Sequence, residues 1–341
     1  MTIVIFTEPT DVHAQAVMRE LSAAGEPDAR IFDFRDVPQR VSLDMALSNR
    51  HGSGFALTCA DGKRLQLEDV RSFWWRRPQT FVMPEGMGAN ERAFALTELS
   101  TALQGMWQAS EALWVNDIVR DAAAAHKPWQ LELARRIGLS IPDTLITTDP
   151  AQARAFWQAR GGEVIYKPFL QTFHSWRETR KLKREELPLL DQLRLAPVIF
   201  QSLVPGAADL RVTIIGSEVF PAAVDLEKVE YALDVRLNQQ AYKRHDLPPA
   251  VSEALLRLMR ELGLEYGAID LRLTPDGEYV FFEVNPAGQF LFVEHACGLP
   301  ISKALAAHLA KGRPSPCPQA GDSRTPRRAR SETRVEVHAS A

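Results

Sequence analysis

The chain has 341 residues, of which 45% are hydrophobic and 24% charged, and its formal net charge is -3. This composition is typical of a globular protein with a full hydrophobic core, and the length predicts two or three domains. The small net charge argues against a nucleic-acid-binding protein that relies on bulk positive charge.

Local sequence features argue against several further classes of protein. Cys59, Cys297 and Cys317 form no C-x-x-C pair, so we expect neither a disulfide framework nor a structural zinc site. The first ten residues lack a basic segment, and no stretch of about 18 apolar residues occurs. We therefore expect no signal peptide, no membrane partner and a cytoplasmic location.

The first 120 residues alternate strand and helix patterns. Strands are predicted at 2–6, 29–34, 72–78 and 114–117, a hairpin at 55–67, and helices at 11–24 and 90–112. This alternation predicts an α/β domain over residues 1–120. The helix at 90–112 is a candidate homodimer interface.

The rest of the chain is richer in strands. Helices are predicted at 127–137, 149–158, 247–262 and 301–310, and strands at 142–147, 163–166, 198–203, 210–215, 219–224, 269–274 and 279–284. We divide this part into a central domain, 121–205, and a C-terminal domain, 206–311. Residues 312–341 hold six arginines and almost no large apolar side chains, which predicts a disordered tail.

The strongest candidate site lies in the hairpin predicted over residues 269–284. Glu283 and Asn285 are two apart and so share a strand face, and Asp270 can face them from the neighbouring strand. Oxygen ligands of this kind suit Mg²⁺, which bridges to substrate phosphates. The alternative is a set of surface charges. The strongly apolar flanks argue against it, because buried carboxylates need a compensating cation.

Two lysines stand at positions suited to phosphate binding. Lys167 follows the apolar strand at 163–166, and Lys127 opens the helix at 127–137. The end of a buried strand and a helix N-terminus are both natural phosphate contacts. Each lysine alone would more often be a solvated surface residue, but beside a magnesium site the two predict a nucleotide polyphosphate.

Arg211, Arg272 and, with weaker support, Arg236 lie in strand-like segments. Arginine binds carboxylates and phosphoryl oxygens through two parallel N–H groups. The alternative role for these residues is in ordinary ion pairs with Asp209 and Asp234. We favour Arg211 and Arg272 as functional residues.

Seven segments, in their order and spacing, resemble the ATP-grasp superfamily. They are residues 73–78, 126–131, 137–146, 166–169, 209–212, 268–271 and 282–289. Within the superfamily the chain resembles the MvdC/MvdD-type ligases, the maturases of microviridins and other graspetides, with the RimK-like ligases as wider relatives. The resemblance covers residues 2–311.

The resemblance implies an ATP-grasp fold of the α/β (α+β) class. It has an N-terminal α/β pre-ATP-grasp domain, a small central domain and a C-terminal antiparallel-sheet domain, with ATP held between the last two. The implied roles are phosphate binding by Lys127 and Lys167, adenine binding by Gln201, Ser202 and Leu203, binding of one or two Mg²⁺ ions by Asp270, Glu283 and Asn285, and stabilisation of the transferred phosphoryl group by Arg211 and Arg272.

Two segments depart from the family pattern. Residues 170–177 contain no glycine, whereas relatives often cover the phosphates with a glycine-containing loop. Residues 203–208 lack the charged residue that relatives often carry near the hinge, so Asp209 is the candidate ribose contact. His174 and His295 are candidates for a general base by residue type alone.

The implied activity is that of an ATP- and Mg²⁺-dependent ligase. It activates an Asp or Glu side chain of a ribosomal precursor peptide, which carries a leader segment, and forms an ester or amide crosslink within that peptide. Two alternatives remain: a RimK-like ligase that adds an amino acid to a protein or small carboxylate, and a non-catalytic nucleotide- or peptide-binding module. The intact acidic residues count against the second.

Overall fold

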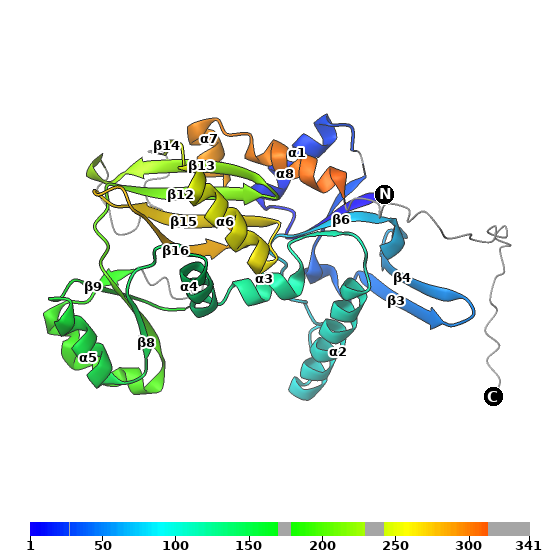
Figure 1. Ribbon diagram of the computed structural model, residues 1–341. Coiled ribbons are helices and arrows are strands. Elements are labelled where there is room, and N and C mark those ends of the chain that lie inside the picture. The colour runs from blue at the N-terminus through cyan, green and yellow to red at the C-terminus, as the bar shows by residue number, and fades with distance from the viewer. Residues whose placement is uncertain (27, 170–178, 229–241, 313–341) are drawn as a thin grey trace.

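The computed structural model describes residues 1–26, 28–169, 179–228 and 242–312. Its strands form one parallel sheet and three antiparallel sheets (Figure 1). The chain is therefore a mixed α/β protein, as the sequence predicts. The expectations for His174, for Arg236, for the glycine-free loop at 170–177 and for residues 313–341 lie outside the described residues.

The N-terminal sheet contains four parallel strands in the order β2-β1-β6-β7. Its elements are β1 (Thr2–Phe6), β2 (Ala29–Phe32), β6 (Val70–Trp75), β7 (Leu113–Val115), α1 (Val12–Ala23) and α2 (Ala89–Gln108). All of β1 is buried, as expected for an inner strand of a parallel sheet. The ring of Phe6 stacks with those of Phe34, Phe73 and Trp114 in the core on one side of the sheet.

A small antiparallel sheet projects from this region and comprises β3 (Val41–Ser48), β4 (Gly52–Cys59) and β5 (Arg64–Gln66) (Figure 1). The sequence predicts the β4–β5 hairpin but not β3. In β3 the apolar residues Val41, Leu43, Met45 and Leu47 occupy every second position, which is the period-2 pattern typical of a strand. Most of the strand, including Leu47, is nevertheless exposed.

Several predicted boundaries in the N-terminal part were wrong. The strands predicted to end at residues 34 and 78 end at Phe32 and Trp75. The helix predicted to reach residue 112 ends at Gln108. The strand predicted over 114–117 ends at Val115, because Asp117 caps the next helix, α3 (Ile118–Ala124). The Asp117 carboxylate accepts hydrogen bonds from the N–H groups of Val119 and Arg120, both at 3.0 Å.

The central sheet contains four antiparallel strands in the order β10-β9-β11-β8. Its elements are β8 (Thr144–Thr147), β9 (Val164–Lys167), β10 (Arg180–Lys181), β11 (Val198–Ser202), α5 (Pro150–Ala159) and a 3-10 helix (Arg184–Leu195). Ala153, Val164, Leu190 and Phe200 share its core. Shorter 3-10 helices span Phe34–Asp36, Leu67–Asp69 and Leu226–Lys228.

The C-terminal sheet contains five antiparallel strands in the order β14-β13-β12-β15-β16. The strands are β12 (Ala208–Ile215), β13 (Glu218–Asp225), β14 (Lys243–Arg244), β15 (Tyr266–Leu273) and β16 (Tyr279–Asn285). Helices α4 (Lys127–Arg136) and α6 (Pro249–Leu262) share a core with this sheet, in which Leu131 and Leu258 join Val212 and Ile269.

The last two helices are α7 (Leu291–Cys297) and α8 (Ile301–Lys311). Helix α8 returns to the N-terminal sheet, where Ile301 and Leu309 share a core with Ile5 and Leu21 (Figure 1). Helix α3 spans the boundary drawn between residues 120 and 121. The division into 1–120, 121–205 and 206–311 stays a proposal, with α8 packed on the first of these parts. Over the described ranges, no helix combines the length and apolar composition that a membrane crossing requires.

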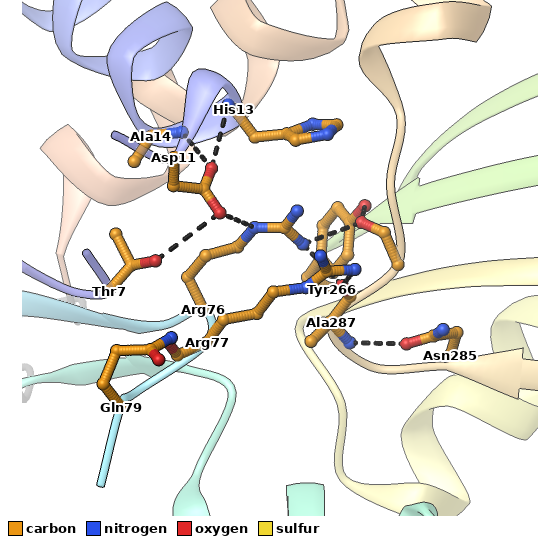
Figure 2. A network of polar contacts seen from close by, with 11 residues as sticks. Thr7, Asp11, His13, Ala14, Arg76, Arg77, Gln79, Tyr266, Asn285 and Ala287 are labelled. Atoms are coloured by element: carbon orange, nitrogen blue, oxygen red, sulfur yellow. Dashed lines mark hydrogen bonds and ion pairs between the residues drawn. The ribbon is translucent and has the colours of Figure 1, made fainter. Parts of the chain in front are cut away.

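A polar network joins the N-terminal sheet to the loop after β16 (Figure 2). Arg76, which directly follows β6, is buried, and its Nη1 donates to the carbonyl oxygens of Ala287 at 2.5 Å and Gly288 at 2.9 Å. Its Nε lies 3.4 Å from the carboxylate of Asp11. The Tyr266 hydroxyl donates to the same Gly288 oxygen at 2.8 Å. The arginine at the end of β6 thus fixes the loop that follows the predicted metal ligands.

His13 lies beside this network on α1. Its side chain is buried, its ring packs 4.7 Å from the ring of Phe290, and its Nδ1 has no hydrogen-bond partner among the described residues. Burial, followed by the charge of Arg76, lowers the pKa of His13 to about 3. An unfolded histidine titrates near pH 6.5, so between these values only the unfolded state binds the proton. Folding stability should therefore fall as the pH drops below about 6.5.

We predict that His13→Leu weakens this acid sensitivity. Between pH 7 and pH 5 the wild-type free energy of unfolding should fall by about 2 kcal/mol more than that of the variant, at about 1.4 kcal/mol per pH unit below 6.5. Urea denaturation at the two pH values measures both losses. Equal losses in the two proteins would contradict the burial of a neutral His13.

Candidate active site

One cavity lies between the central and C-terminal sheets. Its walls come from α4, β9, β11, β12, β15, β16 and neighbouring segments. It is lined by all of the predicted contacts to metal, ATP and the phosphoryl group except Asn285, namely Lys127, Lys167, Gln201, Ser202, Leu203, Asp209, Arg211, Asp270, Arg272 and Glu283. Residues predicted from distant segments therefore meet at one place.

Two ion pairs bridge β12 and β15. The antiparallel register sets Asp209 opposite Arg272 and Arg211 opposite Asp270. Nε and Nη2 of Arg272 lie 2.6 and 2.8 Å from the two Asp209 oxygens, and Nη1 of Arg211 lies 3.0 Å from Oδ1 of Asp270. Residues two apart on a strand share a face, so both pairs lie on the cavity side of the sheet.

Asp209 is committed to Arg272 through both carboxylate oxygens. Burial raises the pKa of Asp209, although the hydrogen bonds and charge of Arg272 oppose this effect. Arg272 also donates from Nη1 to the carbonyl oxygen of Val204 at 3.0 Å. This arrangement favours a role for Asp209 in orienting Arg272 over the expected contact with a ribose.

We predict that Asp209→Leu lowers the free energy of unfolding by about 3–5 kcal/mol, because it breaks a buried ion pair in which the carboxylate binds both Nε and Nη2 of Arg272. Urea denaturation measures the loss. The double variant Asp209→Leu, Arg272→Met should recover most of it, since a buried pair replaced by apolar groups is close to neutral. A single variant as stable as wild type would show that the pair is not buried as described.

Asp270 and Glu283 lie opposite each other on β15 and β16. Their side chains are 34% and 29% exposed, so both carboxylates are open to the cavity. Nζ of Lys127, in the first turn of α4, contacts Oε2 of Glu283. Burial raises the pKa of Asp270. Burial acts on Glu283 in the same direction, but the charges of Lys127 and Lys167 outweigh it and hold the pKa of Glu283 low.

The charges of the cavity wall suit a polyanion together with a divalent cation. Among the described residues that line it, four side chains are basic and three are acidic: Lys127, Lys167, Arg211 and Arg272 against Asp209, Asp270 and Glu283. Burial lowers the pKa of Lys167, with the charge of Glu283 opposing it. Added phosphate groups would offset the excess of basic side chains.

The two exposed carboxylates fit a Mg²⁺ site. Mg²⁺ is usually held by one or two protein carboxylates together with substrate phosphates and water. Asp270 and Glu283 supply two such groups from adjacent strands. Nowhere in the described ranges do three or more His, Cys, Asp or Glu residues form a cluster that could hold an ion. The remaining ligands would have to be phosphate oxygens, water or an amide.

Asn285 is the one predicted metal ligand that does not line the cavity. It is exposed at the end of β16, and its Oδ1 accepts a hydrogen bond from the N–H of Ala287 at 3.1 Å (Figure 2). An asparagine side chain that binds its own backbone two residues on stabilises a turn. Strand alternation predicts the face of Asn285 but does not reveal this turn.

The predicted adenine-binding segment lines the cavity at the end of β11, an inner strand of the central sheet. The N–H groups of Ser202 and Leu203 donate to the carbonyl oxygens of Asp143 and Glu163, both at 2.9 Å. The side chain of Gln201 donates to the hydroxyl of Thr144 at 3.0 Å. A nucleobase beside this segment would therefore meet side chains and carbonyl oxygens, because these two N–H groups already donate to other residues.

The sequence missed an aromatic part of the wall. The rings of Tyr242 and Phe292 lie 5.3 Å apart, and the guanidinium carbon of Arg211 lies 5.8 Å from the ring centre of Phe292. Neither residue belongs to a predicted motif, although Phe292 follows the segment 282–289 by three residues, and no local pattern marks them. His295 is exposed on α7 and does not line the cavity.

The matches to known proteins include peptide-modifying ligases. A sequence model of the MvdD pre-ATP-grasp domain matches residues 2–122. The macrocyclase MdnC from Microcystis aeruginosa MRC, solved with precursor peptide MdnA, is 31% identical. This match covers 91% of this chain and 100% of MdnC, with a TM-score of 0.80. No curated protein sequence matches the chain.

Two further solved structures are similar to the chain over most of its length. The RiPP-associated ATP-grasp ligase of Chryseobacterium gregarium, in complex with ADP and a leader and core peptide, is 24% identical, with 91% of this chain and 97% of that one covered and a TM-score of 0.82. The ATP-grasp ligase PsnB, complexed with a minimal precursor, Mg and ADP, is 26% identical, with 91% and 96% covered and a TM-score of 0.73. Because the similarity to MdnC extends over the whole of that macrocyclase, the chain belongs to the MvdC/MvdD-like ATP-grasp ligases, the graspetide maturases.

Proposed function

We propose that this ligase uses ATP and Mg²⁺ to form an ester or amide crosslink within a ribosomal precursor peptide that carries a leader and a core. The observation that carries the proposal is the cavity, which combines two exposed carboxylates with four basic side chains in a chain related to a peptide macrocyclase. A cytoplasmic location is part of the proposal, because ATP and newly made precursors meet there.

The chemistry must first activate a carboxylate, which resists attack because of its negative charge. An oxygen of the peptide carboxylate attacks the γ-phosphorus of ATP, the bond to the β-phosphate oxygen breaks, and ADP leaves. The acyl phosphate that forms has a good leaving group. A hydroxyl or amine of the same peptide then attacks the acyl carbon, loses its proton and displaces phosphate.

The residues of the cavity suit the positioning and charge neutralisation that phosphoryl transfer requires. Lys127 and Lys167 would bind the phosphates of ATP. Arg211 and Arg272 would stabilise charge on the transferred group, with Arg272 oriented by Asp209. Asp270 and Glu283 would hold one or two Mg²⁺ ions, which neutralise phosphate charge when bound.

The other proposed roles have weaker support. Gln201, Ser202 and Leu203 line the cavity and remain the proposed adenine wall. Asn285 remains a proposed metal ligand, but its side chain would have to leave the N–H of Ala287. A RimK-like activity would need the same carboxylate activation and differs only in the nucleophile. A non-catalytic module would have no use for the paired carboxylates and basic side chains.

The proposal is tested by incubating the protein with ATP, Mg²⁺ and a peptide encoded nearby in the genome that is rich in Asp or Glu and in Ser, Thr or Lys. Loss of the mass of one water for each bond formed is the expected result. A gain in mass equal to an added amino acid would favour the RimK-like alternative. A peptide of unchanged mass, with no ADP formed, would favour the non-catalytic alternative.

A further inference from the structure

A buried glutamine binds the backbone next to Glu283. Gln130 on α4 is 2% exposed. Its Oε1 accepts a hydrogen bond from the N–H of Val284 at 2.9 Å, and its Nε2 donates to the carbonyl oxygen of Val284 at 2.8 Å. The Nε2 group also donates to the carbonyl oxygen of Ala124. Both the oxygen and the nitrogen of the Gln130 amide are therefore fixed by hydrogen bonds to the backbone.

These contacts replace a missing strand. Among the described strands β16 lies at the edge of its sheet, so the outward-facing backbone groups of Val284 have no neighbouring strand there to bind. At Val284 the amide of Gln130 supplies both the acceptor and the donor that a strand would offer. Buried backbone groups left unpaired are costly, so this part of β16 depends on Gln130 for its position.

The same helix face also reaches the side chain of Glu283. Lys127 and Gln130 are three residues apart on α4, and residues at this spacing lie on one face of a helix. Lys127 contacts the Glu283 carboxylate, and Gln130 binds the backbone of the next residue. One helical turn thus holds both the side chain of Glu283 and the strand that carries it.

We propose that Gln130 is a positioning residue that fixes the Glu283 carboxylate relative to Lys127, and so sets the affinity of the site for Mg²⁺ in the presence of nucleotide. The proposal rests on the proposed function, because it takes Glu283 as a metal ligand and Lys127 as a phosphate contact. Gln130 itself does not line the cavity, so it acts through Val284 and not by touching substrate.

The test uses the full-length protein and measures ADP binding by calorimetry, with and without Mg²⁺. In Gln130→Met, which removes both hydrogen bonds to Val284, we expect the gain in ADP affinity caused by Mg²⁺ to fall by about 10–100-fold, as is typical when a partner behind a metal ligand is lost. Affinity for ADP without Mg²⁺ should be unchanged. Mn²⁺ binding, followed by electron paramagnetic resonance, should weaken in parallel.

Two further variants make the test specific. Gln130→Asn keeps an uncharged amide but is shorter by one methylene group, so it should weaken both hydrogen bonds to Val284, show a smaller defect of the same kind, and carry the test if Gln130→Met does not fold. Leu258→Ala is the matched control, because Leu258 lies on α6 and is buried in the core that this helix shares with the C-terminal sheet. It should lower the melting temperature without changing the effect of Mg²⁺, because it leaves the backbone contacts of β16 in place.

Two outcomes would overturn the inference in distinguishable ways. If the Gln130 variants lost thermal stability but kept the wild-type effect of Mg²⁺ on ADP binding, Gln130 would have a structural role only. If the wild-type protein bound ADP equally well with and without Mg²⁺, the metal assignment in the proposed function would fail, and this inference would fail with it.

Discussion

Glu283→Gln and Asp270→Asn should each slow ADP release at saturating ATP and peptide by about 10²–10³-fold, the usual effect of losing one group that stabilises a transferring charge. Each change preserves the size of the side chain and removes the negative charge that a hard cation requires. Both carboxylates are partly exposed in the cavity, so their neutral amides leave the core intact. A coupled assay for ADP measures the rate, and the melting temperature reports the fold.

Asp276 supplies the matched control for these carboxylates. It lies exposed in the turn between β15 and β16 and does not line the cavity. Asp276→Asn should release ADP at the wild-type rate. Wild-type turnover in both Glu283→Gln and Asp270→Asn would falsify the metal assignment, because the third carboxylate that lines the described part of the cavity, Asp209, is bound by Arg272 through both oxygens.

Arg211→Met should lower kcat by about 10³–10⁵-fold if its guanidinium stabilises the transferred phosphoryl group, which is the range observed for arginines in that role. The side chain is 10% exposed and lies against Asp270, so water cannot take the place of the guanidinium in the variant. Arg211→Lys should retain part of the rate, because it keeps the charge but loses the planar pair of donors. Single-turnover ADP formation isolates this step from product release.

Arg211 could instead act only by holding Asp270, which its Nη1 contacts at 3.0 Å. Under that reading, Arg211→Met would weaken Mg²⁺ binding, and a high concentration of Mg²⁺ would restore the rate. A role on the phosphoryl group predicts that added Mg²⁺ does not restore it. A titration of Mg²⁺ at saturating ATP therefore separates the two roles. A rate that returned to the wild-type value would contradict the role of Arg211 on the phosphoryl group.

Local patterns predicted most of the charged residues that share the cavity, and the family resemblance added Gln201, Ser202, Leu203 and Asp209. The two-residue spacing of Asp209 and Arg211, and of Asp270 and Arg272, sets each pair on one strand face. The partners across the strands could not be predicted, because the pairing of Asp209 with Arg272 depends on the register of two strands far apart in sequence. Asp209 was expected to contact a ribose because its pairing with Arg272 across the strands was not visible in the sequence.

Other features were missed because they depend on tertiary contacts. Helix α8 follows the C-terminal sheet in sequence but packs on α1 of the N-terminal part. Gln130 reads as an ordinary helical residue until Val284 is seen beside it. Each of these depends on a contact between segments that are distant along the chain, which local propensity does not encode.

The most direct measurement of the central claim is the ratio of ADP formed to water lost from the peptide. Purified protein would be incubated with ATP, Mg²⁺ and its precursor, with ADP measured enzymatically and the peptide examined by tandem mass spectrometry. The account predicts one ADP for each water lost, with every new bond joining two side chains of the same peptide. A peptide that loses water without ADP formation, or ADP formed at the same rate without peptide, would contradict it.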